Sequence, residues 1–130
     1  MADPKLDERM FDSVIEAGQT ALKGAMLING GAATALLAVI AEAFKSKDGL
    51  LPSLVPHLSL AWLCFVSGLG LAGLALGCRY FSQHAYSDNA FRRGDRWNTA
   101  SRASGVSSLL AFFLGSLIAF FAFRTPLLAS

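Results

Sequence analysis

Side chains that could carry acid–base or metal chemistry are few in this sequence and lie far apart. His57 and His84 are separated by about 40 Å along one helix, so one chain cannot bring both imidazoles to a single haem iron. Glu42 is the only carboxylate inside an apolar block, and it lies near the end of that block, three residues from Lys45. These spacings predict no catalytic residue, metal site or cofactor, and we expect that the protein is not an enzyme.

Sequence motifs lead to the same expectation. The stretch GLGLAG at 68–73 fits the G-x-G-x-x-G pattern, but it lies inside an apolar block rather than in a strand-to-helix turn. Cys64 and Cys78 are about 21 Å apart on one helix, a distance that excludes a disulfide within the chain. Both are expected to be small buried thiols.

The elements that position these residues are apolar blocks of a length that suits a membrane. Hydrophobic residues make up 54% of the chain and charged residues only 15%. The blocks 25–44, 58–78 and 104–123 are each long enough to cross about 30 Å of hydrocarbon as a helix. The sequence therefore predicts an all-α integral membrane protein with a single domain, three transmembrane helices and helical extensions outside the lipid.

Proline and glycine residues predict where the first helix begins and ends. Pro4 suits a first helical position, and nothing breaks the helical pattern before about Ser46. The amphipathic arm 1–23 is therefore expected to continue into the first span. A loop is predicted over 45–56, with the second helix beginning near 53–56.

The second and third helices are predicted to form a hairpin over 79–103. Gly94 is expected to follow the end of the second helix, and Asp95 to cap the third. Residues 124–130 form the predicted tail.

Arginine placement predicts the orientation in the membrane. The hairpin has a net charge of +3, because two aspartates are outnumbered by five arginines: Arg79, Arg92, Arg93, Arg96 and Arg102. By the positive-inside rule the hairpin and the N-terminus face the cytoplasm, and the C-terminus faces the periplasm or exterior, of a bacterial inner membrane. Anionic lipids are the expected partners of these arginines, and no nucleic acid is expected.

The arm 1–23 has a net charge of −2, opposite in sign to that of the hairpin. We predict that the arm packs against the hairpin of the same or a neighbouring subunit. The alternative is an arm that lies flat on the membrane, which anionic lipids would disfavour.

His84 shares one predicted helix face with Tyr80, Ser87 and Phe91 outside the lipid. This position makes His84 a candidate partner contact or pH-responsive group.

Small residues recur at helical spacing in all three spans, and in lipid such stripes allow close contact between helices. The stripes are Gly24, Gly31, Ala35 and Ala38 in the first helix, Ser67, Gly70, Gly73 and Gly77 in the second, and Ser101, Ser104, Ser108, Ala111, Gly115, Ala119 and Ala122 in the third. We predict that these stripes form the contacts within the bundle and between subunits.

Asn29, followed by Gly30 and Gly31, lies about 6 Å inside the first span. At that depth its amide needs a partner, and Ser104, Ser107 or Ser108 of the third helix lies at a compatible level. The alternative is that Asn29 faces water in a pore.

These features predict a small membrane protein that associates with itself through small-residue faces, with a pore or channel-like oligomer as one form. The alternative is a non-catalytic accessory subunit of a larger bioenergetic or transport complex. Small three-span holins have a comparable size and topology, but no sequence motif is shared with them, so the analogy is one of architecture alone.

Overall fold

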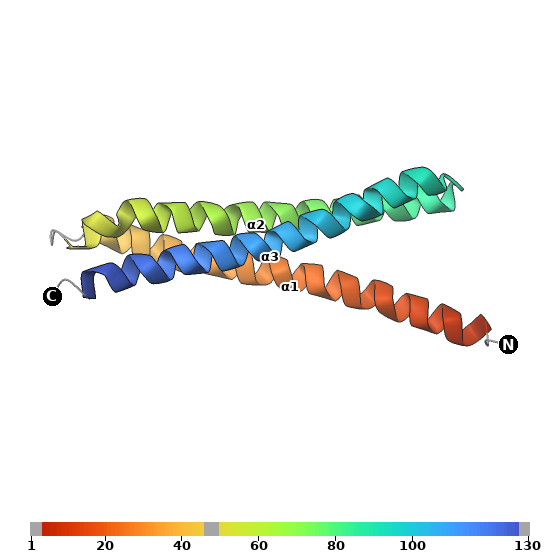
Figure 1. Ribbon diagram of the computed structural model, residues 1–130, viewed down its shortest axis with the longest axis horizontal. Helices are drawn as coiled ribbons and strands as arrows, with labels where there is room; N and C mark the ends of the chain where they lie inside the picture. The colour runs from red at the N-terminus through yellow and green to blue at the C-terminus, as the bar shows by residue number, and fades with distance from the viewer. Residues whose placement is uncertain (1–3, 46–49, 128–130) are drawn as a thin grey trace.

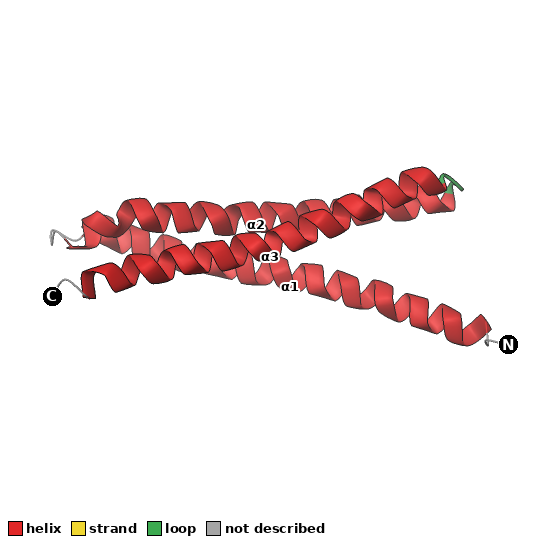
Figure 2. Cartoon of the chain, in the orientation of Figure 1, coloured by secondary structure: helices red, strands yellow, loops and turns green. Residues whose placement is uncertain are grey.

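The protein consists of three long α-helices in a computed structural model that describes residues 4–45 and 50–127 (Figures 1 and 2). The helices are α1 (Pro4–Lys45), α2 (Leu50–Ser87) and α3 (Phe91–Leu127). Each helix is long and apolar enough to cross a membrane. The all-α, three-span architecture predicted from the sequence is therefore confirmed, and the chain is a multi-pass membrane protein.

The first helix begins at Pro4, as predicted, and runs without interruption from the arm into the span. Residues 46–49 lie outside the described residues. The second helix begins at Leu50, earlier than the predicted start near 53–56. Proline is tolerated in a first helical turn, so Pro52 does not delay the helix, and the helix also continues through Pro56.

The turn between α2 and α3 lies before Gly94, which corrects the prediction that Gly94 ends the second helix. Asn89 has a φ of 56°, in the left-handed region that asparagine tolerates better than most residues. The Ala90 N–H donates to the Ala85 carbonyl at 2.9 Å, and the Asn89 N–H donates to the Tyr86 carbonyl at 3.1 Å. These two bonds form a Schellman motif that ends α2.

Gly94 lies inside α3, and a methyl group there would collide with the Tyr86 ring. The ring is fixed by the hydrogen bond that its hydroxyl donates to Asp95, at 2.7 Å. Gly94 and Asp95 therefore close the hairpin through contact with α2, and neither of them caps a helix.

The second and third helices pack antiparallel in one register. Every seventh residue of α3, starting at Gly94, is buried and small, and these residues meet every seventh residue of α2. The Ser82 hydroxyl donates to the Gly94 carbonyl at 2.8 Å, and the Ser101 hydroxyl donates to the Ala75 carbonyl at 2.7 Å. A seven-residue period keeps the same face toward the partner along a supercoiled pair.

The remaining layers of this register are Gly68 with Ser108, Ala61 with Gly115, and Leu54 with Ala122. The Ser108 hydroxyl donates to the Gly68 carbonyl at 2.7 Å. A methyl group on Gly115 would lie 3.1 Å from the Ala61 carbonyl oxygen. Small side chains thus bring the two backbones together along the whole pair, which is the contact that lipid-embedded helices favour.

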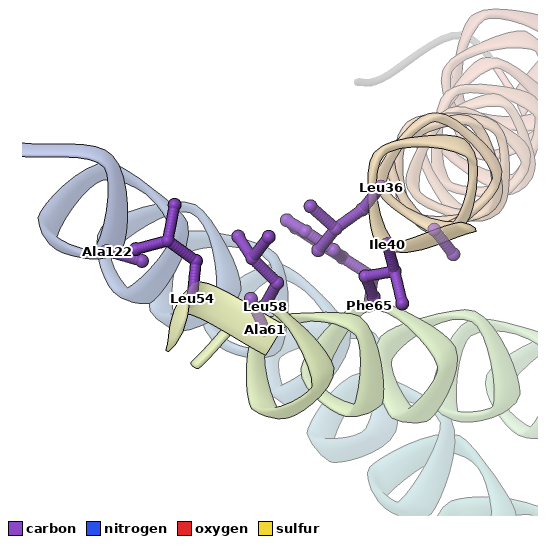
Figure 3. Close-up of a cluster of buried hydrophobic side chains, with 8 residues drawn as sticks. Leu36, Ile40, Leu54, Leu58, Ala61, Phe65 and Ala122 are labelled. Carbon is purple, nitrogen blue, oxygen red and sulfur yellow. The ribbon is translucent and has the colours of Figure 1, made fainter. Parts of the chain in front are cut away.

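The C-terminal half of α1 packs against this pair, and its N-terminal half diverges from the pair (Figure 1). Ala33, Leu36 and Ile40 of α1 contribute to one buried cluster with residues of the other two helices, seen in Figure 3. The other members of this cluster are Leu54, Leu58, Ala61 and Phe65 of α2 and Ala122 of α3.

The beginning of the arm lies apart from the hairpin of its own chain (Figure 1). Between described side chains, Lys45 forms an ion pair with Glu42 and His84 lies beside Asp88, and neither contact joins the arm to the hairpin. No ion pair between described side chains therefore joins arm and hairpin. The predicted contact within one subunit is present at one point, where Arg79 of the hairpin bonds to the Ile15 carbonyl of the arm.

Candidate functional site

Asn29 lies at the point where the three helices meet, and its side chain is fully buried. Its amide nitrogen donates to the Ser108 hydroxyl oxygen at 3.2 Å and to the Ser108 carbonyl at 3.4 Å, besides a bond to Ala25 of its own helix at 3.0 Å. Because the Ser108 hydroxyl donates in turn to Gly68, a chain of hydrogen bonds links α1, α3 and α2. The interhelical contact expected from the sequence is present, with Ser108 as the partner.

The carbonyl oxygen of the Asn29 side chain, Oδ1, is buried and has no hydrogen-bond partner within the described residues. It lies against Gly68, where a methyl group would collide with it. The absence of a side chain at Gly68 therefore makes the space in which the amide fits. Gly68 was not among the sequence-predicted packing residues; its seven-residue spacing from Ala61 and Ala75 is the signal that identifies it.

The small-residue stripe predicted on the third helix lies in the bundle interior. Ser101, Ser108, Gly115 and Ala122 are buried, and Ser104 is half-buried between them. A methyl group on Gly115 would lie 3.0 Å from the Phe65 ring and 3.1 Å from the Cys64 side chain, both of α2.

The stripe predicted on the second helix lies on the outside of the bundle. Ser67 and Gly70 are exposed, Gly73 and Gly77 are half-buried, and a methyl group at any of the three glycines would meet open space. The face that α2 presents to its own bundle carries Gly68, Ala72, Ala75 and Ser82 instead. The prediction that Gly70, Gly73 and Gly77 form contacts within the bundle is therefore wrong for the single chain.

The glycines of the first helix also point away from the bundle for the most part. Gly24 and Gly31 face open space, whereas a methyl group on Gly30 would lie 3.7 Å from the Leu69 side chain, in ordinary contact. The interior face of α1 carries Ala25, Asn29 and Ala33.

Arg79 is the hairpin arginine that reaches another helix. Its Nη2 donates to the Ile15 carbonyl of α1 at 2.9 Å, and its guanidinium fills the space beside Gly18, where a methyl group would collide with it. The other predicted arginines, Arg92, Arg93, Arg96 and Arg102, are exposed. The hairpin thus presents a basic surface and ties one arginine into the junction with α1.

His84 is exposed near the tip of the hairpin, with its Nδ1 3.3 Å from a carboxylate oxygen of Asp88. The Tyr80 ring lies edge-on to its imidazole, at a centroid distance of 6.5 Å. A shallow hollow beside it is lined by Phe81, Arg93 and Trp97. His84 is therefore placed at a surface that a partner could reach.

Within residues 4–45 and 50–127, no three His, Cys, Asp or Glu side chains are grouped so that they could hold a metal ion. Cys64 and Cys78 are free thiols, and Cys78 is buried.

Comparisons with protein-family models, with curated proteins and with solved structures give no match to this chain. Two features outside the bundle interior are candidates for a functional surface. One is the outward α2 glycine face, formed by Gly70, Gly73 and Gly77, and the other is the basic junction of the hairpin with α1.

Proposed function

We propose that this protein is a self-associating membrane protein whose copies join through the α2 glycine face. The observation that carries this proposal is the open space at Gly70, Gly73 and Gly77, on a helix whose interior face is already filled by its own chain. In lipid there is no hydrophobic gain from covering an apolar face, so close backbone approach at small residues is what favours association. The buried polar residues Asn29, Ser101 and Ser108 do not compete for this role, because they already bond within the chain.

Cysteine cross-linking in native membranes tests this interface. In a background in which Cys64 and Cys78 are replaced by alanine, Gly70→Cys, Gly73→Cys and Gly77→Cys are expected to form disulfide-linked dimers on mild oxidation. A disulfide requires Cα atoms within about 7 Å, so the reaction reports direct helix contact.

Matched controls are available on α3, where Leu110 and Leu117 are more than half exposed, at 63% and 54%, and do not belong to the α2 glycine face. Leu110→Cys and Leu117→Cys are expected to remain monomeric. Equal cross-linking at all positions would show random collision, and cross-linking at the control positions alone would contradict the proposed interface.

A pore formed by the oligomer is the second candidate, supported by two exposed hydroxyl-bearing residues. Ser67 of α2 and Ser107 of α3 are both exposed and lie next to Gly68 and Ser108, which share one layer of the helix register. Several copies could therefore supply a ring of hydroxyl groups at one depth, the kind of lining that a water-filled path requires.

Ion leakage from liposomes that contain only this protein tests the pore. The wild type is expected to leak, and Ser67→Leu with Ser107→Leu is expected to reduce the leak severalfold while assembly is retained. Ser116→Leu is a matched control, because that hydroxyl bonds to its own helix at Phe112. Sealed liposomes would contradict the pore, and recovery only in a stoichiometric complex with other proteins would favour an accessory subunit.

The proposed setting is a bacterial inner membrane with the N-terminus and the hairpin in the cytoplasm. The excess of arginine over aspartate in 79–103 supports this orientation.

A further inference from the structure

A crevice lies between α1 and the hairpin. It is on the side where the N-terminal half of α1 diverges from the other two helices, a divergence seen in Figure 1. It consists of two adjoining hollows of about 370 Å³ and 510 Å³. Val14, Arg79, Asn98 and Arg102 line both hollows, so the two are continuous at these residues. The volumes fall in the range of protein sites that hold small ligands.

The shared part of the crevice is cationic. Arg79 is held there by its bond to the Ile15 carbonyl and by the space beside Gly18, and this leaves other guanidinium N–H groups available. Arg102 lines the same space from α3, together with the Asn98 amide. Between described side chains, neither arginine forms an ion pair with a carboxylate, so the crevice presents two positive charges without a described counter-ion.

One end of the crevice is apolar and runs toward the membrane. From the arginines, the smaller hollow extends along Leu22, Ala25, Val106 and Leu109, which belong to the apolar parts of α1 and α3. Arg79 directly follows the expected span 58–78 and Arg102 lies two residues before the expected span 104–123, so both lie near the end of a span, close to the depth of lipid phosphate groups.

We propose that this crevice binds one anionic phospholipid, with its phosphate between Arg79 and Arg102 and one acyl chain along Leu22, Val106 and Leu109. Guanidinium groups bind phosphate in a bidentate manner, and the adjoining apolar wall suits a hydrocarbon chain. A free phosphate ion would leave that wall unused. The acidic arm of a second copy would match the charge, but its apolar side chains are much shorter than an acyl chain and would cover only part of the membrane-side wall.

Native mass spectrometry of the full chain in detergent tests this site, with phosphatidylglycerol and phosphatidylcholine of identical acyl chains as probes. The wild type is expected to retain one phosphatidylglycerol and to discriminate against phosphatidylcholine. Arg79→Gln with Arg102→Gln is expected to weaken phosphatidylglycerol binding by at least about tenfold, since loss of even one charge-assisted hydrogen bond has an effect of this order.

The matched control is Arg92→Gln with Arg93→Gln, which removes the same charge from exposed hairpin positions outside the crevice. It is expected to change binding by less than about threefold, because neither side chain lines the crevice and exposed charges outside a site contribute little. Equal loss in both double variants would show general attraction to the basic hairpin and would overturn the site.

A variant that keeps both charges covers the case in which the arginine variant does not fold. Val106 is exposed and lies on the apolar wall, so Val106→Trp fills the space for the acyl chain. This variant is expected to lose long-chain phosphatidylglycerol while still binding soluble glycerol phosphate weakly. Full retention of the lipid in Val106→Trp, or displacement of the lipid from the wild type by an acidic peptide of residues 1–23, would contradict the proposed occupant.

Discussion

Replacement of Gly115 by leucine is expected to force α2 and α3 apart and to destabilise the bundle by about 2–3 kcal/mol, the upper part of the range for overpacking a filled interior. The reason is local crowding. A methyl group alone would lie 3.0 Å from the Phe65 ring and 3.1 Å from both the Ala61 carbonyl oxygen and the Cys64 side chain. The carbonyl belongs to a helix backbone, so it cannot move without displacing α2.

The measurement is thermal unfolding in detergent, followed by the near-ultraviolet circular dichroism of the two tryptophans and by the rate at which Cys78 reacts with a maleimide. Cys78 is only 4% exposed in the folded bundle, so its reaction reports opening. Gly31→Leu makes the same chemical change at a position that faces open space, and it is expected to leave the transition unchanged. Identical transitions for the two variants would contradict the packing of α2 on α3.

Replacement of Asn29 by leucine is expected to detach α1 from the other two helices while the α2–α3 pair remains formed. The change removes the amide bonds to Ser108, and interhelical hydrogen bonds of this kind contribute about 0.6–2 kcal/mol in membranes. It also places a branched side chain against Gly68, where the present amide already fills the space. The hydrogen bond from Ser108 to Gly68 does not involve Asn29, so it is expected to persist.

Distances between spin labels at exposed positions of α1 and α3 measure this detachment. Labels at Leu37 and Leu117, both about half exposed, are expected to give a narrow distance distribution in the wild type and a broad one in Asn29→Leu. Thr34→Leu is the matched control, because the Thr34 hydroxyl bonds only to Gly30 of its own helix. An unchanged distance with an altered ion leak would instead indicate that Asn29 faces water in a pore.

The sequence predicts the three helices and the level at which Asn29 meets α3 for a simple reason. A membrane fixes the length of a span, so counting 1.5 Å per residue from the end of a block places residues of different helices at comparable depths. Ser108 is accordingly one of three expected partners. Choosing among the three requires the rotation of α3, which is set by the contact between Ser108 and Gly68.

The same sequence is ambiguous about which face of α2 is buried, because this helix carries small residues on two faces. Gly70, Gly73 and Gly77 contain a G-x-x-x-G pair, whereas Gly68, Ala72 and Ala75 do not. Gly68 and Ala75 are buried because they belong to an unbroken run of small residues at seven-residue spacing, from Ala61 to Ser82, which matches Ser101, Ser108 and Gly115 on α3. The large residue Leu63 interrupts the corresponding run through Gly70 and Gly77. Spacing between partner helices is thus more informative here than a motif on one helix.

The position of the turn illustrates a second ambiguity. Gly94 and Asp95 form a favourable pair for ending one helix and starting another, yet the chain turns at Asn89. Asparagine tolerates a left-handed φ, and the turn at Asn89 brings Gly94 opposite Ser82 and beneath the Tyr86 ring. The contacts of Gly94 with Ser82 and Tyr86 of α2 therefore explain why this glycine lies inside α3 and not at the end of α2.

Self-association through the α2 glycine face is tested most directly by the native mass of the protein extracted from its membrane with surrounding lipid. The chain has a mass of 13.8 kDa, and we expect an integral multiple of that mass, which falls to the single-chain mass in Gly73→Leu. Gly24→Leu, at an equally open position on α1, is expected to retain the multiple. A single-chain mass for the wild type, or an unchanged multiple in Gly73→Leu, would contradict the proposed assembly.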